Sequence, residues 1–223
     1  MEKHIKKDCW YKDSELCPNN HNCDENGCMR YTTLMYQFKN SELPKSQFYP
    51  VKLYAPKVDT DAFQRLGEIK TNIDEFVREG KNLYICSAYT GNAKTSWAVK
   101  LLQKYFSYLA GYNYDNPLGM YVSTTQLLLK LKDFNNPLPQ SYKDKLHNID
   151  LVIFDDIAIT GVSQYDYTQL FSIIDSRIFA GKSCIFTSNY TTLAQLTNVL
   201  GSRLASRIFN TSEIIEFKGK DMR

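Results

Sequence analysis

Long apolar runs are absent from this chain of 223 residues, and none approaches the roughly 20 apolar residues that a helix needs to span a bilayer. The opening residues are polar and carry charges of both signs, unlike a secretory leader. We therefore expect a cytoplasmic protein that makes no membrane contact.

A large excess of one charge is absent as well. The net charge is +3, and the lysines and arginines form no dense patch such as a dedicated nucleic-acid binder usually carries. The apolar fraction of 43% and the charged fraction of 23% are typical of a globular protein. The length fits one α/β domain with a small accessory module, whereas two comparable cores would not fit.

Composition divides the chain into three zones. Residues 1–36 are rich in cysteine and poor in aliphatic side chains, and residues 37–60 contain three prolines, which disfavour helix. Regular periodicity begins near Asp61. We interpret residues 1–36 as an interaction module, 37–60 as a connector and 61–223 as the main domain.

Within residues 61–223, short apolar runs alternate with segments of helical periodicity. The predicted strands are 82–86, 119–122, 151–154, 183–187 and 213–217. The predicted helices are 61–79, which Gly80 ends, and 95–109, 125–132, 167–179, 193–200 and 202–209. This alternation predicts an α/β fold, a mostly parallel sheet covered by helices on both faces.

The sharpest motif is AYTGNAKT at residues 88–95, between a predicted strand and a predicted helix. Against the phosphate-loop pattern G-x-x-x-x-G-K-S/T, Lys94 and Thr95 are in register, but Ala88 and Ala93 replace both glycines. Lys94 would supply a cation to the phosphates of ATP and Thr95 a ligand to Mg²⁺. The alternative is an ordinary turn with a chance Lys-Thr pair. The expected nucleotide contacts from this segment are Thr90, Gly91, Asn92, Ala93, Lys94, Thr95 and Ser96.

Two acidic residues end the predicted strand 151–154. Asp155 and Asp156 would lie at the carboxyl edge of the sheet, where ligands bind in folds of this kind. Asp155 would hold Mg²⁺, and Asp156 would orient the attacking water. The alternative is a pair of solvated acids at the start of a loop.

Polar residues near two later elements complete the candidate catalytic set. Asn189 follows the strand 183–187 and would contact the γ-phosphate or the water, although an asparagine that begins a turn is common. Arg203 and Arg207 are four residues apart and share a helical face. Either an arginine finger or ordinary surface arginines would fit that spacing.

Four cysteines crowd the first zone, whereas Cys86 and Cys184 lie inside apolar runs. Thiolates with a nearby imidazole suit a tetrahedral Zn²⁺ site, and metal binding can fold a segment with little apolar content. Free thiols, a disulfide and an iron–sulfur cluster are the alternatives. The candidate ligands are Cys9, Cys17, Cys23 and Cys28, with His21 among them.

The order of these motifs over residues 60–223 resembles that of the AAA+ helicase loaders, the DnaC/DnaI-like proteins of bacteria and their phages. The connector with Leu43-Pro44 and the Cys-rich segment resemble the phage-type members. The resemblance implies an oligomeric ATPase that binds a DnaB-type replicative helicase through its N-terminal segment and loads it onto single-stranded DNA.

The resemblance also implies residue roles. Lys94 and Thr95 would be the Walker A contacts, Asp155 and Asp156 the Walker B pair, and Asn189 the sensor. Arg207 would act as a finger across a subunit boundary, with Arg203 beside it. For zinc, Cys9, Cys17 and Cys28 match best, and Cys23 is preferred slightly to His21 as the fourth ligand. Arg223, in the basic end of the chain, is a further candidate phosphate contact.

Aromatic and basic residues give two expected surfaces. A basic surface for single-stranded DNA would carry Tyr121, the helix 127–132 and lysines 130, 132, 143 and 145, although solvated helix faces look the same. An apolar set in the first zone would meet the partner or pack within its own module; it comprises Trp10, Tyr11, Tyr31, Leu34, Met35, Tyr36 and Phe38.

Two departures from the family pattern matter. The alanines add a Cβ near the phosphates, and Asp156 stands where many AAA+ proteins have glutamate. We therefore expect slow hydrolysis, suited to a switch. The alternatives are a non-hydrolysing adaptor and a transposition-helper ATPase similar to IstB, against which the Cys-rich segment argues.

Overall fold

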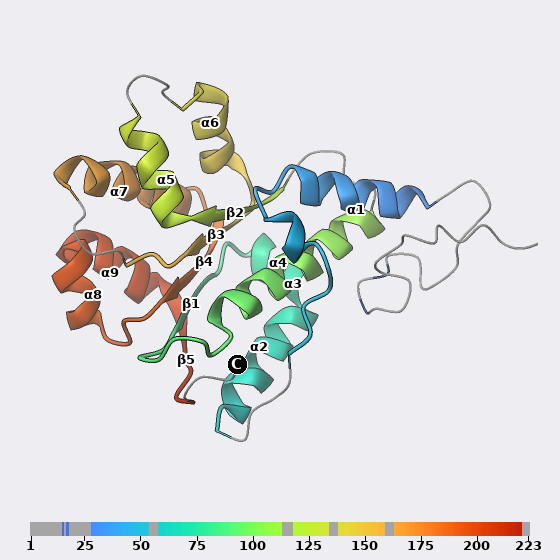
Figure 1. The fold of residues 1–223 in the computed structure, drawn as a ribbon, viewed down its shortest axis with the longest axis horizontal. Coiled ribbons are helices and arrows are strands. Elements are labelled where there is room, and N and C mark those ends of the chain that lie inside the picture. The colour runs from blue at the N-terminus through green and yellow to red at the C-terminus, as the bar shows by residue number, and fades with distance from the viewer. Residues whose placement is uncertain are drawn as a thin grey trace, which may run out of the picture.

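Five parallel strands form the centre of the molecule, in the order β2-β3-β4-β1-β5 (Figure 1). The computed structural model describes Glu15, Cys17 and residues 28–53, 58–112, 118–133, 138–158 and 163–219. The strands begin and end close to their predicted bounds: β1 (Asn82–Cys86), β2 (Gly119–Ser123), β3 (Leu151–Asp155), β4 (Ser183–Ser188) and β5 (Ser212–Glu216).

Helices cover both faces of this sheet (Figure 1). The first group of helices is α1 (Met29–Lys39), α2 (Thr60–Thr71), α3 (Ile73–Arg78) and α4 (Lys94–Gly111), and the second group, on the other face, is α5 (Thr124–Lys132), α6 (Gln140–Asn148), α7 (Gln164–Phe179), α8 (Leu193–Leu200) and α9 (Ser202–Thr211). Along β1, Ile85 packs with the first group, whereas Tyr84 and Cys86 pack with the second. The predicted α/β fold with a parallel sheet covered by helices is therefore confirmed. No helix in the described ranges is long and apolar enough to cross a membrane.

The predicted helix 61–79 is wrong as one continuous element. It is two helices, α2 and α3, which meet at Asn72, where φ is −111° and ψ is 36°. The break lets both helices bury apolar side chains, Phe63 and Leu66 from α2 and Phe76 from α3. Gly80, with φ of +65°, follows α3 and ends the helical region as predicted.

Helices α1 and α6 were not predicted. Helix α6 buries a single residue, Leu146, so its sequence has almost no apolar periodicity. Helix α1 runs across the expected boundary between residues 36 and 37, and its Leu34 and Phe38 are fully buried. The ring of Phe38 lies edge-on to Phe106 of α4, 5.1 Å between centroids. Leu34 and Phe38 are therefore part of the core of the main domain and are not available to a partner, whereas Tyr36 is 44% exposed.

The end of α1 also covers the outer edge of the sheet. Strand β2 is one of the two edge strands, and the N–H of Tyr121 donates to the carbonyl of Ser41 over 2.7 Å. Just before β2, the N–H of Leu118 donates to Oε1 of Gln37 over 3.2 Å. Gln37 and Ser41 are both fully buried. The last turn of α1 and the residues just after it therefore accept hydrogen bonds from backbone groups that an edge strand would otherwise leave open.

Candidate nucleotide site

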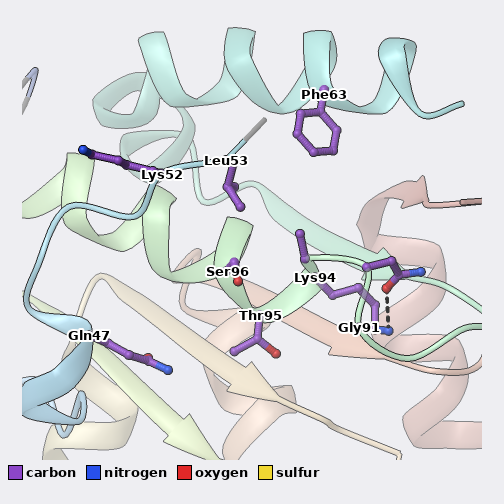
Figure 2. A pocket seen from close by; sticks show the side chains of 10 residues that line it. Gln47, Lys52, Leu53, Phe63, Gly91, Lys94, Thr95 and Ser96 are labelled. Atoms are coloured by element: carbon purple, nitrogen blue, oxygen red, sulfur yellow. Dashed lines mark hydrogen bonds between the residues drawn. The ribbon is translucent and has the colours of Figure 1, made fainter. Parts of the chain in front are cut away.

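The loop between β1 and α4 borders a hollow of about 550 Å³ (Figure 2). This volume lies within the range of roughly 300–1,000 Å³ that small-molecule sites occupy. The lining joins this loop and the start of α4 to residues of the connector and α2: Gln47, Lys52, Leu53, Phe63, Gly91, Asn92, Ala93, Lys94, Thr95 and Ser96. Of the predicted loop contacts, only Thr90 is outside this lining, and it is exposed.

Lys94 makes its hydrogen bonds inside the loop. Its Nζ donates to the carbonyl of Tyr89 over 3.0 Å and to Oδ1 of Asn92 over 3.1 Å. Asn92 is buried and in turn donates to Oγ of Ser87. Burial lowers the pKa of Lys94 from its usual value, and the nearby carboxylate of Asp156 opposes that shift. Phosphate oxygens would have to replace the two loop acceptors.

The two alanines in the loop differ in backbone conformation. Ala93 has φ of +66° and ψ of 12°, in the left-handed region, where a side chain costs about 1–2 kcal/mol relative to glycine. Ala88 is not among the described residues with positive φ, so its Cβ is accommodated without that strain. Only one of the two departures from the phosphate-loop pattern therefore strains the backbone.

Asp155 is the centre of a hydrogen-bonded cluster at the carboxyl edge of the sheet. Its Oδ1 accepts from the hydroxyls of Thr95 and Thr187, each over 2.7 Å. Its Oδ2 accepts from the hydroxyl of Tyr121 over 2.7 Å. The fold thus brings together Thr95 and Asp155, the two predicted Mg²⁺ ligands, from the first turn of α4 and the end of β3. Both offer the hard oxygen atoms that Mg²⁺ prefers.

Thr187 and Tyr121 were not predicted as members of this site. Their positions in the sequence could have indicated the site, because both residues lie on predicted strands of a parallel sheet, and the carboxyl ends of such strands meet at one edge. Tyr121 was instead expected on a DNA-binding surface, and that expectation is wrong. Its side chain is 9% exposed, and its hydroxyl is bonded to Asp155, so its ring cannot stack on a base.

The expected basic surface is also partly occupied by contacts within the chain. Lys132 forms an ion pair with Asp166 over 2.7 Å, and Lys145 donates to the carbonyl of Asn40. The Nζ of Lys130 lies 5.3 Å from the ring centroid of Tyr142. Three of the four lysines of this expected surface therefore have partners within the chain, and the surface itself stays a prediction.

Asp156 follows directly, with φ of +53° and an exposed side chain. Its N–H donates to Oγ1 of Thr187 over 2.9 Å, which fixes the turn after β3. Although the residue is exposed, nearby protein atoms remove part of the water around its carboxylate, and this desolvation, with the charge of Asp155 beside it, raises the pKa of Asp156 above its usual value. Asn189 directly follows β4, the strand that carries Thr187, and its side chain is exposed.

The two arginines lie apart from this cluster. Arg203 and Arg207 line a second hollow of about 710 Å³ with residues of α7 and α9, and it shares no lining residue with the first. Nε of Arg207 contacts Oδ1 of Asp175 over 2.7 Å, and its side chain is 52% exposed. Within one chain, the guanidinium is therefore held by α7.

The predicted zinc ligands lie mostly outside the described residues. Cys9, Cys23 and His21 are in that part, as is Arg223, the further candidate phosphate contact. Cys28 is the N-cap of α1, and its Sγ accepts from the N–H of Tyr31 over 3.3 Å. The described residues alone contain no group of three or more His, Cys, Asp or Glu that could hold a metal. The zinc site stays a prediction.

A parallel sheet, a strand-loop-helix turn that carries Lys94 and Thr95, and a strand-end aspartate beside them define a P-loop ATP-binding domain. Comparison with protein families places the chain more narrowly. Residues 35–223 match the family of IstB-like ATP binding proteins, and the chain belongs to that family. No curated protein sequence matches it.

Solved structures with this fold include the DnaC helicase loader, DnaI and DnaA. The crystal structure of the DnaC helicase loader is 24% identical, with 78% of this chain and 100% of that chain covered and a TM-score of 0.64. DnaI is 18% identical, with coverage of 79% and 95% and a TM-score of 0.62. AMPPCP-bound DnaA from Aquifex aeolicus is 19% identical, with coverage of 74% and 48% and a TM-score of 0.55. The resemblance to DnaC/DnaI-like AAA+ proteins is thus confirmed in fold.

Proposed function

We propose that this protein is an ATP-dependent loader of a DnaB-type replicative ring helicase onto single-stranded DNA, acting in the cytoplasm during phage or bacterial replication. One observation carries the proposal: the hydroxyl of Thr95, the residue after Lys94, lies 2.7 Å from Oδ1 of Asp155, in a chain whose fold is that of the helicase loader DnaC. Membership of an ATP-binding family supports the nucleotide.

The residues present fit ATP and Mg²⁺. The loop offers backbone N–H groups at the start of α4, whose dipole favours an anion, and Lys94 adds a positive charge. The hydroxyl of Thr95 and the carboxylate of Asp155 would hold the metal, which when bound neutralises charge that develops on the phosphates. Gly91, Asn92 and Ser96 line the same hollow and would contact the phosphates.

Hydrolysis would use residues beyond the phosphate loop. Asp156 would orient the attacking water, and Asn189 would hold that water or the γ-phosphate. Arg207, with Arg203 one turn away, would reach the γ-phosphate of a neighbouring subunit in a homo-oligomer. The strained Ala93 and the short side chain of Asp156 favour slow turnover, which suits a switch that changes state once per loading event.

The N-terminal segment would be a zinc-held adaptor for the helicase, with Cys9, Cys17, Cys23 and Cys28 as ligands and His21 as the alternative to Cys23. Two described residues support contact between this segment and the ATPase domain. Glu15 pairs with Lys70 over 2.8 Å and with Lys100 over 3.4 Å. Cys17 packs against the core.

Two rival functions have some support. Family membership favours an IstB-like helper of transposition, which would share the ATPase core. The left-handed Ala93 favours an adaptor that binds nucleotide weakly and does not hydrolyse it. ATP turnover separates these functions when it is measured for the chain alone, with single-stranded DNA, and with both DNA and the helicase of the host.

The loader proposal expects turnover that single-stranded DNA and the helicase raise together, and that Lys94→Ala abolishes. Turnover that responds to DNA but not to the helicase would support the transposition helper. Turnover equal to that of Lys94→Ala under all three conditions would support the adaptor.

Elemental analysis should find about one equivalent of zinc per chain, since a tetrahedral site holds one ion.

A further inference from the structure

We propose that Tyr121 is a positioning residue for the metal-binding carboxylate of Asp155, acting through its hydroxyl. The inference rests on the proposed function, because it assigns Asp155 to Mg²⁺. It starts from the 2.7 Å contact between the Tyr121 hydroxyl and Oδ2 of Asp155, two residues that are 34 positions apart in the sequence.

The register of the sheet explains how this contact forms. Tyr121 of β2 lies opposite Ile153 of β3, and Ser123 lies opposite Asp155. Tyr121, Ile153 and Asp155 therefore project from the same face of the sheet, the face on which α4 lies, because side chains alternate along a strand. The diagonal distance from Tyr121 to Asp155 is one that a tyrosine side chain can span.

Both ends of Tyr121 are held. Its backbone N–H donates to the carbonyl of Ser41, and its hydroxyl donates to Asp155. Ser41 is fully buried, and its own Oγ donates to the carbonyl of Phe38 over 2.8 Å and accepts from the N–H of Leu43 over 3.3 Å. The hydroxyl therefore approaches Asp155 from a fixed strand with a buried side chain and not from a mobile loop.

The contact restricts the carboxylate. The two threonine hydroxyls bind Oδ1, so Tyr121 is the described residue that holds Oδ2, and the two sides together fix the rotation of the carboxylate. A tyrosine hydroxyl keeps its proton at neutral pH, so it acts as the donor in this contact. A carboxylate already oriented loses less entropy when it binds the metal.

Tyr121→Phe removes this hydroxyl and keeps the ring. The test titrates Mg²⁺ against a fixed concentration of the fluorescent analogue mant-ATP, from excess chelator upward, and records the Mg²⁺ concentration at half-maximal tight binding. We expect that concentration to rise about tenfold, as for the loss of one hydrogen bond to a charged group. Affinity for mant-ATP in chelator should stay within about twofold of the wild type, since the phosphate loop is intact.

Tyr84→Phe is the matched control. Tyr84 is a buried tyrosine of β1 on the opposite face of the sheet, and its hydroxyl donates to the carbonyl of Tyr190 over 2.8 Å, away from Asp155. It should leave the Mg²⁺ midpoint unchanged. A general loss of packing would move both variants alike, and that result would overturn the positioning role.

A double-mutant cycle with Asp155→Ala completes the test. In that background the Tyr121→Phe change should have no further effect on Mg²⁺-dependent binding, because the acceptor is gone. An unchanged Mg²⁺ midpoint in Tyr121→Phe, with a wild-type chain that binds Mg²⁺ and mant-ATP, overturns the role of Tyr121 alone. A wild-type chain that binds no mant-ATP at saturating Mg²⁺ overturns the proposed function itself.

Discussion

The phosphate end of the candidate site and the arginine-bearing face of α9 differ in how complete they are within one chain. Around Asp155, three hydroxyls from three different elements are already hydrogen-bonded to one carboxylate. On α9, Arg203 is exposed, and Arg207 is paired with Asp175 in a separate hollow. Under the proposed function, one chain would supply the binding half of the site and a neighbouring chain would supply the arginine.

The largest expected effect would test the arginine half. Arg207→Ala should lower ATP turnover by about 10³-fold in the assembled oligomer, because a finger stabilises charge in the transition state. Affinity for ATP should change by less than about twofold, since Arg207 lines a different hollow from the phosphate loop in the described part of the chain. Steady-state turnover and equilibrium binding, measured on the same preparation, check both statements.

Asp175→Asn supplies the control, since it releases Arg207 from its partner within the chain and leaves the arginine in place. Turnover should be kept or increased in this variant. Equal loss of turnover in Arg207→Ala and Asp175→Asn would show that the ion pair matters only for structure. The arginine face of α9 would then have no catalytic role separate from the Asp155 cluster.

The second effect concerns the binding half. Lys94→Ala should weaken ATP binding by about 10- to 100-fold, because a charge-assisted hydrogen bond to phosphate is lost. Lys81→Ala is the control, because Lys81 is exposed and pairs with Glu79 outside the hollow. Isothermal titration with ATP and Mg²⁺ measures both. Equal affinities in the two variants would remove Lys94 from the binding half.

A smaller effect separates the two alanines of the loop. Ala93→Gly should tighten ATP binding by about fivefold, because the loop no longer holds a Cβ in the left-handed region. Ala88→Gly should have no such effect, since its φ is not positive. The same titration distinguishes them, and an equal response at both positions would mean that backbone strain does not limit binding.

The smallest expected effect is on the melting temperature and on how that temperature depends on pH. A raised pKa means that folded Asp156 holds its proton more tightly than the unfolded chain does, so its charge destabilises the fold at neutral pH and that penalty disappears on acidification. Asp156→Asn should therefore raise the melting temperature at pH 7 by about 1–3 °C, an allowance reduced for the exposed side chain. The difference should shrink as the pH falls toward 4, as calorimetry at several pH values would record.

Much of this fold is readable from the sequence because its strands are short apolar runs. Residues 82–86 and 151–154 are buried throughout, so their composition reports their environment directly. Helix α6 carries one buried residue, so it lacks the repeated apolar spacing from which a helix is predicted. Helix α1 has that spacing in Tyr31, Leu34, Met35 and Phe38, but it crosses the predicted boundary between the Cys-rich zone and the connector.

The candidate site was predictable only where a local pattern carries the chemistry. Lys94, Thr95 and Asp155 follow from a loop and a strand end, and the fold brings all three together. The hydroxyl of Tyr121 reaches Asp155 only through sheet register, which no local pattern encodes. The sequence likewise shows that a glycine is missing at position 93, but it does not show that Ala93 adopts the left-handed backbone conformation.

The turn after α1 limits how far this protein can be shortened. A version that begins after residue 41 would leave the N–H groups of Leu118 and Tyr121 without their acceptors, along the outermost strand of the sheet. Exposed strand edges recruit other strands, so we expect such a truncation to self-associate and precipitate. Soluble versions that lack the Cys-rich residues should therefore retain α1 from Met29 onward.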